Sequence, residues 1–218
     1  MFVCLEPVYL ANILLHVDNV KSIKAFPFAS KNCHEAMLSL KVNPASFCWE
    51  PPAIIKFFPN INTMVVKNLM CFGKTSLLPN TVTAIVVKSV SFYDLTEEGL
   101  KYADRVVEIR DNWSGDESPA DFALFPNLKR LRLYGVPERV TLPKHTLKRL
   151  SVFCEKRDVD PFTVFPPECA EQVVVVHPTR KEFVEAKAKP LPPNVCVFCT
   201  QIGEGVTPAD FFTQWRLG

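Results

Sequence analysis

Two cysteines near the C-terminus have a spacing that is common in metal sites. Cys196 and Cys199 form a Cys-x-x-Cys pair, and thiolates at this spacing are typical of zinc ligands. The residues around them, however, predict a β-strand, in which residues three apart face opposite sides. The other cysteines are scattered, and no second close pair completes a set of four ligands. The sequence therefore predicts no metal site.

Other candidates for chemistry are incomplete. Gly73-Lys74-Thr75 ends like a phosphate-binding loop, but that motif needs a glycine five positions before Gly73, where this chain has Asn68. No two carboxylates have a defensible geometry for acid–base chemistry. A cysteine nucleophile paired with a histidine stays open, although no local signature supports it; the histidines are His34, His145 and His177. We therefore predict a protein that is not an enzyme and uses no cofactor.

Arginines recur at alternating positions of three predicted strands. The cluster consists of Arg110, Arg130, Arg132 and Arg149. Residues two apart on a strand share a face, so these side chains should stand within one or two strand spacings of about 4.8 Å. They repel each other unless Glu108 or a binding partner neutralises them.

Two aromatic residues, Tyr134 and Phe153, flank this arginine cluster at positions that should be exposed. Arginine beside exposed aromatic residues is typical of interaction hot spots. We interpret these six residues as a concave surface that holds an acidic segment of a protein partner. A solvated charged face is the alternative. Single-stranded nucleic acid also suits arginine and aromatic residues, but a net charge of only +2 argues against it.

A repeated pattern is expected to position these residues. Leu128, Leu131 and Leu133 form a Leu-x-x-Leu-x-Leu unit, and one such unit cannot bury its own apolar face. Similar units begin about 20–25 residues apart, which is close to the leucine-rich-repeat period. The starts are Ile61, Val82, Val106, Leu128, Leu147, Ala170 and Val195. In the unit that starts at Val106, Asp111 stands where the last apolar residue should be.

This pattern predicts an α/β fold, a short curved leucine-rich-repeat solenoid of parallel strands. An ordinary α/β domain with short strands is the alternative, but most gaps lack the amphipathic helix of a βαβ crossover. Aligning the repeats gives three outward rows: Thr63, Ala84, Glu108, Arg130, Arg149 and Gln172; Val65, Val86, Arg110, Arg132, Ser151 and Val174; and Lys67, Lys88, Asn112, Tyr134, Phe153 and Val176.

Helices are predicted at both ends of the repeats. Residues 1–44 contain three apolar helical stripes, with Pro27 placed in the first turn of the third helix. Residues 45–57 are predicted to be a linker with aromatic anchors, and residues 58–200 the repeats. In residues 201–218, Thr207 and Pro208 begin a helix, whose aromatic residues would cap the core; they are Phe211, Phe212 and Trp215.

The N-terminal segment resembles an F-box. The residues that carry the resemblance are Leu5, Pro7, Leu10, Ile13, Leu14, Val17, Val20, Ile23, Ser30, Lys31 and Cys33. Joined to leucine-rich repeats, the chain resembles the F-box-like leucine-rich-repeat proteins that are numerous in amoebic protists. The resemblance implies a substrate-recognition subunit of a cullin-type ubiquitin ligase. It also implies that an adaptor docks on the segment through Leu5, Pro7, Leu10, Leu14 and Val17.

The alternative is that these helices only cover the open apolar end of the repeats, which makes the protein a scaffold with no ubiquitin link. The composition fits either case: 48% of residues are hydrophobic and 22% charged, as in globular proteins. No apolar run approaches the ~20 residues of a membrane span. The first residues do not predict a signal peptide, so the eight cysteines should be reduced thiols in the cytoplasm.

Overall fold

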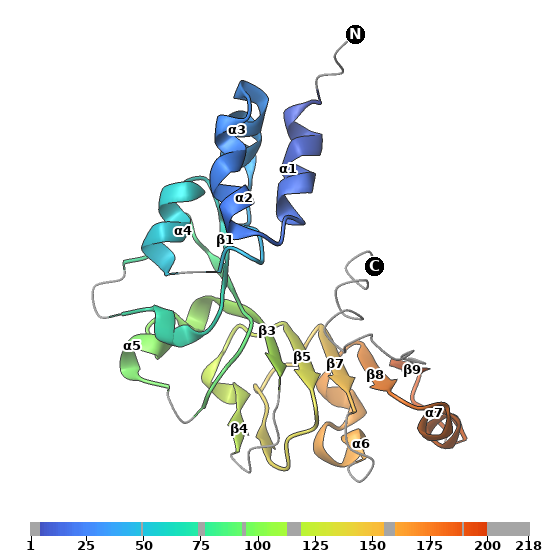
Figure 1. Ribbon diagram of the computed structural model, residues 1–218. Coiled ribbons are helices and arrows are strands. Elements are labelled where there is room, and N and C mark those ends of the chain that lie inside the picture. Colours follow the sequence, from blue (N-terminus) through green and yellow to red (C-terminus); the bar gives the residue numbers. More distant parts are fainter. Residues whose placement is uncertain are drawn as a thin grey trace. The chain divides into compact units, whose positions relative to one another are not determined.

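A computed structural model describes residues 5–48, 50–73, 77–92, 95–112, 119–154, 160–188 and 190–199. Its contacts divide the chain into two compact units, Met1–Val107 and Glu108–Gly218. The fold is an α/β fold with helices at the N-terminal end and a seven-stranded parallel sheet in the order β1-β2-β3-β5-β7-β8-β9 (Figure 1). The predicted α/β class and the parallel strands are therefore confirmed.

The first unit begins with three helices. They are α1 (Pro7–Leu15), α2 (Val20–Ala25) and α3 (Lys31–Ser39), with a 3-10 turn, η1 (Phe26–Phe28), before α3. The side chain of Asn19 caps α2, and the Ser30 hydroxyl accepts a hydrogen bond from the Cys33 N–H at 3.1 Å, which satisfies an otherwise unpaired donor. The placement of Pro27 in the first turn of the third helix is therefore wrong, because Pro27 lies in η1 and Ser30 begins α3.

A fourth helix, α4 (Pro51–Phe57), lies within the predicted linker. Its first two residues are prolines. They lie in the first turn, where the N–H group that proline lacks would have no hydrogen-bond partner within the helix. The Phe47 ring is fully buried and packs against those of Phe57 and Phe58, with ring centroids 5.1 and 5.4 Å apart. The sequence pattern missed the helix. Of the aromatic anchors predicted for the linker, Phe57 packs against Phe47 and Phe58, and Trp49 lies outside the described residues. The predicted domain boundaries stay predictions.

The first two strands are β1 (Thr63–Val66) and β2 (Ala84–Val87). Thr63 pairs with Ala84 and Val65 with Val86, which is the predicted register. The inward side chains are fully buried; they are Met64, Val66, Ile85 and Val87. The first unit also contains η2 (Leu69–Cys71), α5 (Glu97–Leu100) and η3 (Ala103–Arg105).

A buried amide lies beside β1. The Asn43 side chain accepts a hydrogen bond from the Val65 N–H at 2.8 Å and donates one to the Val65 carbonyl at 2.9 Å. It also donates to the Phe47 carbonyl at 2.8 Å. The Asn43 side chain thus takes the place that the backbone of a neighbouring strand would occupy. Both the N–H and the carbonyl of Val65 are hydrogen-bonded without a further strand.

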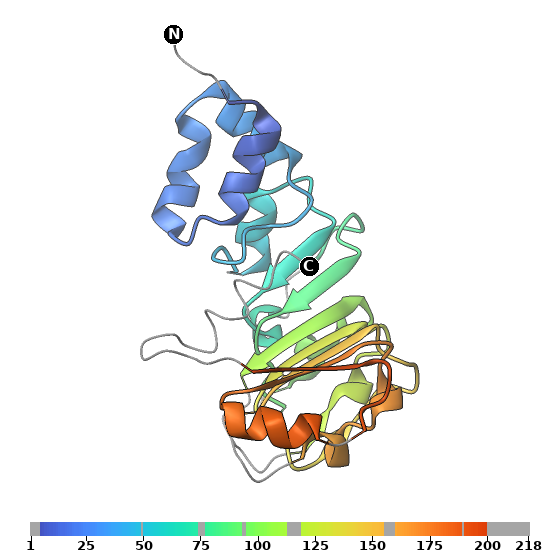
Figure 2. The same ribbon diagram turned by 90° about the vertical axis from the view of Figure 1, so that its right-hand side faces the viewer.

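Strand β3 (Val106–Asn112) crosses the boundary between the two units, and its residues from Glu108 onward begin the parallel ladder of the second unit. The next strands of this ladder are β5 (Arg130–Tyr134), β7 (Arg149–Phe153), β8 (Val173–His177) and β9 (Val195–Cys199). Asp111 pairs with Leu133 and is buried, so the predicted register holds at the point where Asp111 interrupts the apolar pattern. Short elements fill the connections: β4 (Ala120–Asp121), β6 (Val140–Thr141), η4 (Phe122–Leu124), α6 (Pro161–Val164), η5 (Pro167–Cys169) and α7 (Arg180–Lys187). Figure 2 shows α7 beside β9.

Polar side chains placed immediately before two strands bind backbone carbonyl groups that precede the neighbouring strand. Arg105 precedes β3 and donates from Nη1, and Asn194 precedes β9 and donates from Nδ2. The acceptors are the carbonyl oxygens of Pro79 and Val82 for Arg105, at 3.3 and 2.9 Å, and those of Pro167 and Ala170 for Asn194, at 2.8 and 2.9 Å. Equivalent positions before two different strands thus make equivalent contacts.

The C-terminal cap predicted for residues 201–218 lies outside the described residues, as do Lys74 and Thr75 of the glycine-lysine-threonine segment. Within the described ranges, every helix is too short or too polar to cross a lipid bilayer.

Candidate functional site

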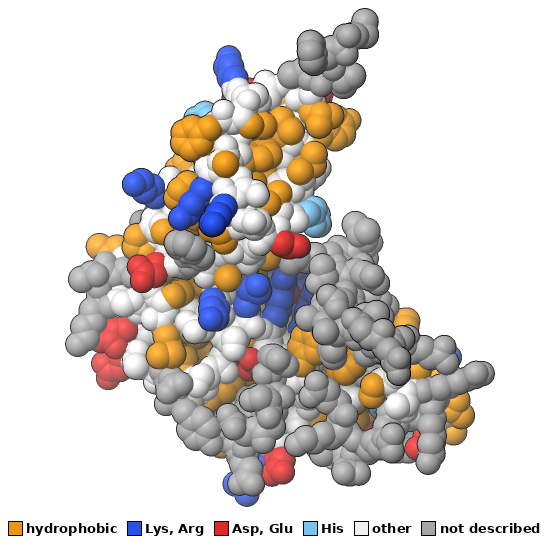
Figure 3. All heavy atoms as spheres, in the orientation of Figure 1, with side chains coloured by type: hydrophobic (Ala, Val, Ile, Leu, Met, Phe, Trp, Pro, Cys, Tyr) orange, Lys and Arg blue, Asp and Glu red, His pale blue; other side chains and the backbone are white. Residues whose placement is uncertain are grey.

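The sheet of the second unit brings the predicted arginine cluster together. Arg130 on β5 pairs in register with Glu108 on β3 and with Arg149 on β7. Arg132, two residues further along β5, is the register partner of Arg110. All five charged residues therefore occupy the same face of three neighbouring strands, as the alignment of repeats predicts. In Figure 3, Lys and Arg side chains gather near the part of the sheet where Figure 1 labels β3.

A single buried carboxylate joins three of these arginines. Only 5% of the Glu108 side chain is exposed. Its Oε1 lies 2.7 Å from the Nε of Arg110 and 3.4 Å from the Nε of Arg132, and its Oε2 lies 3.7 Å from Nη1 of Arg130. The contact with Arg110 is a charge-assisted hydrogen bond of ordinary length. Glu108 thus anchors the cluster from within the sheet.

The charges of the cluster change the proton affinity of this carboxylate. Burial by itself would raise the pKa of Glu108, but the charge and hydrogen bond of Arg110, together with the charges of Arg132 and Arg130, lower the pKa below its ordinary value. Burial lowers the pKa of Arg132, the charge of Glu108 opposes that shift, and the neighbouring arginines add to it. At neutral pH the cluster therefore holds one negative charge among four guanidinium groups.

The guanidinium groups differ in their access to solvent. The exposed fraction of the side chain is 57% for Arg130, 28% for Arg110 and 20% for Arg132. Arg149 is half-buried. In the part of the chain that the structure describes, the three arginines paired with Glu108 carry more positive charge than that carboxylate balances. Planar guanidinium groups bind carboxylate and phosphate oxygens in pairs.

The two aromatic residues of the predicted surface have different environments. Tyr134 is half-buried, with its ring centroid 6.0 Å from that of Phe153. Phe153 is only 1% exposed and packs with Val174 and Val176. The predicted exposure of Phe153 is therefore wrong. Its outward neighbours on β8 are valines, which form an apolar cluster with it instead of leaving its ring open to solvent.

The residues predicted to dock an adaptor are not equally accessible. Leu14 is fully buried in the N-terminal segment, where α1 packs on α3. Pro7, Leu10 and Val17 are half-buried, and Leu5 is 45% exposed. Four exposed apolar residues of this segment instead form a stripe on and just before α1, which consists of Leu5, Val8, Tyr9 and Ile13; Phe28 in η1 is exposed apart from it. The prediction of docking residues did not include Val8, Tyr9 or Ile13. The available signal was helical spacing, since Val8 and Tyr9 lie three and four residues after Leu5, and Ile13 lies four residues after Tyr9.

Of the candidates for covalent chemistry, the sheet brings one histidine next to a cysteine, since His177 on β8 is the register partner of Cys199 on β9. Burial raises the pKa of the Cys71 thiol to about 11, and that of the Cys169 thiol also to about 11, so both stay protonated and weakly nucleophilic at neutral pH. His145 Nε2 lies 2.6 Å from the Leu128 carbonyl oxygen. Cys196 is exposed and Cys199 half-buried on β9. The described part of the chain contains no group of three metal-ligating side chains placed to hold an ion.

No protein-family model matches this chain, and no curated protein or solved structure matches it.

Proposed function

We propose that this chain is a non-catalytic protein–protein recognition module whose arginine cluster binds an acidic segment of its partner. The observation that carries the proposal is the placement of Arg110, Arg130 and Arg132 around one buried carboxylate, Glu108, with Arg149 beside Arg130 on the same face of the sheet. Within the described residues, three guanidinium groups pair with Glu108, and one carboxylate balances the charge of only one of them. Carboxylates of a partner would supply the missing negative charge and use the hydrogen-bond geometry that arginine offers.

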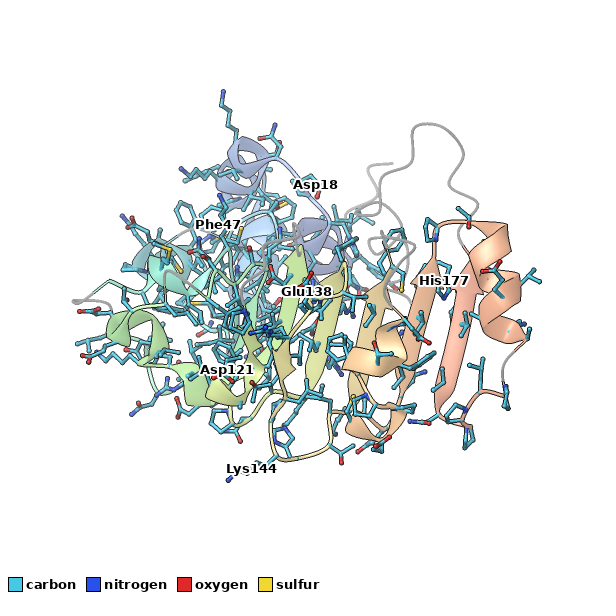
Figure 4. The ribbon with its side chains drawn as sticks, turned by 90° about the horizontal axis from the view of Figure 1, so that it is seen from below. Asp18, Phe47, Asp121, Glu138, Lys144 and His177 are labelled. Carbon is cyan, nitrogen blue, oxygen red and sulfur yellow. The ribbon has the colours of Figure 1, made fainter. Side chains whose placement is uncertain are left out.

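The test exchanges the charge of the two arginines on β5. The double variant Arg130→Glu/Arg132→Glu should lose partners that the tagged, intact chain captures from cell extract, and an added hexaglutamate peptide should release the same partners from the unaltered chain. The matched control is Lys144→Glu/Lys187→Glu, which makes the same change in net charge at exposed positions; Figure 4 shows Lys144 pointing away from the sheet.

The control variant should capture partners like the unaltered chain, and all three proteins should melt at similar temperatures. Capture that survives the β5 charge reversal rejects the surface. Capture that falls equally in both variants indicates an effect of net charge alone. Release by salt and by single-stranded DNA, without release by hexaglutamate, would favour a nucleic-acid partner.

The sheet belongs, in this proposal, to a leucine-rich-repeat solenoid. Its support is the regular spacing of the strands and the equivalent contacts of Arg105 and Asn194 before two of them. The resemblance of the N-terminal segment to an F-box extends the proposal to a substrate-recognition subunit of a cullin-type ubiquitin ligase. The exposed stripe Leu5, Val8, Tyr9 and Ile13 supports that extension, because contiguous exposed apolar residues mark interaction surfaces.

Co-purification of the ligase adaptor with the intact chain tests this extension. Val8→Asp should abolish co-purification because it places a charge in the exposed stripe. Val184→Asp is a matched control, since Val184 on α7 is 57% exposed and Val8 is 58% exposed. Equal co-purification by both variants would leave the alternative, a repeat scaffold with no ubiquitin link whose N-terminal helices only cap the core.

A further inference from the structure

We infer that Glu108 is a positioning residue for ligand binding, which holds Arg110 and Arg132 as a fixed guanidinium pair that grips one oxyanion group of the partner. The inference rests on the proposed function of the arginine cluster as a binding surface. It goes further by assigning separate roles to the charged residues and by naming the chemical group, a carboxylate or a phosphate monoester, that the pair takes.

The geometry of the ion pairs carries the first step. Arg110 and Arg132 are register partners on adjacent strands. Both approach Glu108 through their Nε atoms, and both approach the same oxygen, Oε1, at 2.7 and 3.4 Å. Two guanidinium groups that share one anchor on their Nε sides keep their terminal Nη groups for another acceptor. Neighbouring planar donors of this kind match the paired oxygens of an oxyanion.

Burial carries the second step. The exposed side-chain fraction is 5% for Glu108 and 20% for Arg132, so the anchor is part of the protein interior and the guanidinium pair lies at its boundary with solvent. An arginine side chain loses several rotatable degrees of freedom when it binds a ligand. Because Glu108 already restrains this pair, that entropic cost is met on folding rather than on binding.

Arg130 has a different role. It is 57% exposed and its Nη1 lies 3.7 Å from Oε2 of Glu108, so its guanidinium group is the least restrained of the three. We assign Arg130 to attraction and outer contact with the ligand. Its loss should weaken binding of every polyanion, whereas loss of the guanidinium pair should weaken binding of the gripped oxyanion.

The change in ligand affinity caused by Glu108→Gln should have opposite signs under this inference and under simple electrostatics. Glu108→Gln removes a negative charge from the surface and keeps the size of the side chain. If only net charge mattered, an acidic ligand would bind severalfold more tightly to the variant. If Glu108 positions the pair, the ligand should bind about 3- to 10-fold more weakly, since a neutral amide is a poorer anchor for two guanidinium groups.

The experiment uses the intact chain and its Glu108→Gln, Glu108→Asp and Arg130→Met variants. Labelled hexaglutamate is the first probe, and the same peptide with one glutamate replaced by phosphoserine is the second. Tighter binding of the second probe identifies a phosphate monoester as the preferred group, and equal binding identifies a carboxylate. Glu108→Asp keeps the charge, so it should recover part of the affinity that Glu108→Gln loses.

A ligand-free measurement separates this inference from the proposed function. In nitrogen-15 NMR spectra, the Nε–H protons of Arg110 and Arg132 should exchange slowly with water in the unaltered chain and at least 5-fold faster in Glu108→Gln. Slow exchange in both proteins, or tighter probe binding by Glu108→Gln, overturns the positioning role while the binding surface stands. Failure of the unaltered chain to bind either probe at low salt overturns the binding surface and, with it, the role of Glu108 in binding.

Discussion

The outward face of the sheet in the second unit has two halves that share one backbone ladder and differ in chemistry. The charged half lies on β3, β5 and the first residue of β7, and consists of Glu108, Arg110, Arg130, Arg132 and Arg149. The apolar half lies on β7 and β8 and consists of Phe153, Val174 and Val176. Along β5 buried and accessible residues alternate, whereas β7 is buried from Leu150 to Phe153 and β8 from Val173 to Val176.

The difference between the two halves shows that the backbone pairing of a parallel sheet does not determine the exposure of its outward side chains. The register is continuous from β3 to β8, so backbone pairing alone does not decide which outward residues are hydrated. Guanidinium groups stay at the solvent boundary because burying a charge without a partner is costly. Aliphatic and aromatic side chains on the next strands pack together instead. Tyr134 joins the two halves, since it follows the arginines on β5 and contacts the Phe153 ring.

The strongest way to break this comparison is to extend the charged half into the apolar half. Val174→Arg places a guanidinium group at a position that is 2% exposed, without a carboxylate beside it. We expect the free energy of unfolding to fall by about 4 kcal/mol or more. Urea denaturation measures this loss. Val184→Arg, at a position that is 57% exposed, should change it by less than about 0.5 kcal/mol.

Removing the largest side chain of the apolar half should have the next largest effect. Phe153→Ala deletes a ring that is 1% exposed and leaves a cavity beside two valines. The expected loss of unfolding free energy is about 3–4 kcal/mol, measured by the same denaturation. Phe28→Ala is the control, because Phe28 is 87% exposed and should contribute almost nothing. A loss below about 1 kcal/mol for Phe153→Ala would mean that the apolar half is not packed.

The charged half should respond to pH in a way that the apolar half cannot. Glu108→Gln should lower the unfolding free energy by about 1–2 kcal/mol at pH 7, a moderate loss because the arginines can still be hydrated. The pKa of Glu108 is lowered in the folded chain, so its stabilisation is complete above the unfolded pKa of about 4.3 and disappears as the pH falls through the folded pKa.

The difference between the unaltered chain and Glu108→Gln is therefore measured at several values from pH 7 down to pH 2. It should shrink only below about pH 4.3. Glu171→Gln, at an exposed position in the turn before β8, is the control and should show little difference at any pH. A Glu108→Gln difference that grows as the pH falls would contradict the charged anchor.

The smallest effect is expected from extending the apolar half into the charged half. Arg130→Met removes an ion pair at 3.7 Å from a side chain that is 57% exposed. Exposed ion pairs contribute little, so the midpoint of thermal unfolding should stay nearly unchanged. A large destabilisation would show that Arg130 is structural. Val174→Arg and Arg130→Met should therefore differ in their effect on stability. Adding a charge to the apolar half should destabilise the fold strongly, whereas removing a charge from the charged half should change its stability little.

The sequence was sufficient to predict the ladder and the charged half. Leu131 and Leu133 alternate with Arg130 and Arg132, so strand periodicity alone assigns each pair to a face. Counting repeats then placed Glu108 opposite Arg130, even though Asp111 interrupts the apolar pattern. Charge balance in turn singled out Glu108 as the neutralising residue. These predictions succeeded because they depend on period and spacing, which the sequence states directly.

The burial of Phe153 could not be predicted in the same way. Its exposure depends on which side chains surround it in space, here Val174 and Val176 from a strand some 20 residues later. Helix α4 was missed because two adjacent prolines indicate a linker unless they happen to begin a helix. The contacts of Arg105 and Asn194 were not predicted either. The only indication in the sequence is a polar residue immediately before a strand, and the sequence pattern varies too much from one strand to the next for that indication to be recognised.

An NMR titration of the intact, nitrogen-15-labelled chain with hexaglutamate tests most directly whether the charged half is the binding surface. We expect the largest chemical-shift changes at backbone amides of residues 108–112 and 130–134, and at the Nε–H groups of Arg110 and Arg132. The amides of Val174 and Val176 should change little. Changes centred on β8, or no changes at concentrations that saturate binding, would contradict a binding surface on the charged half.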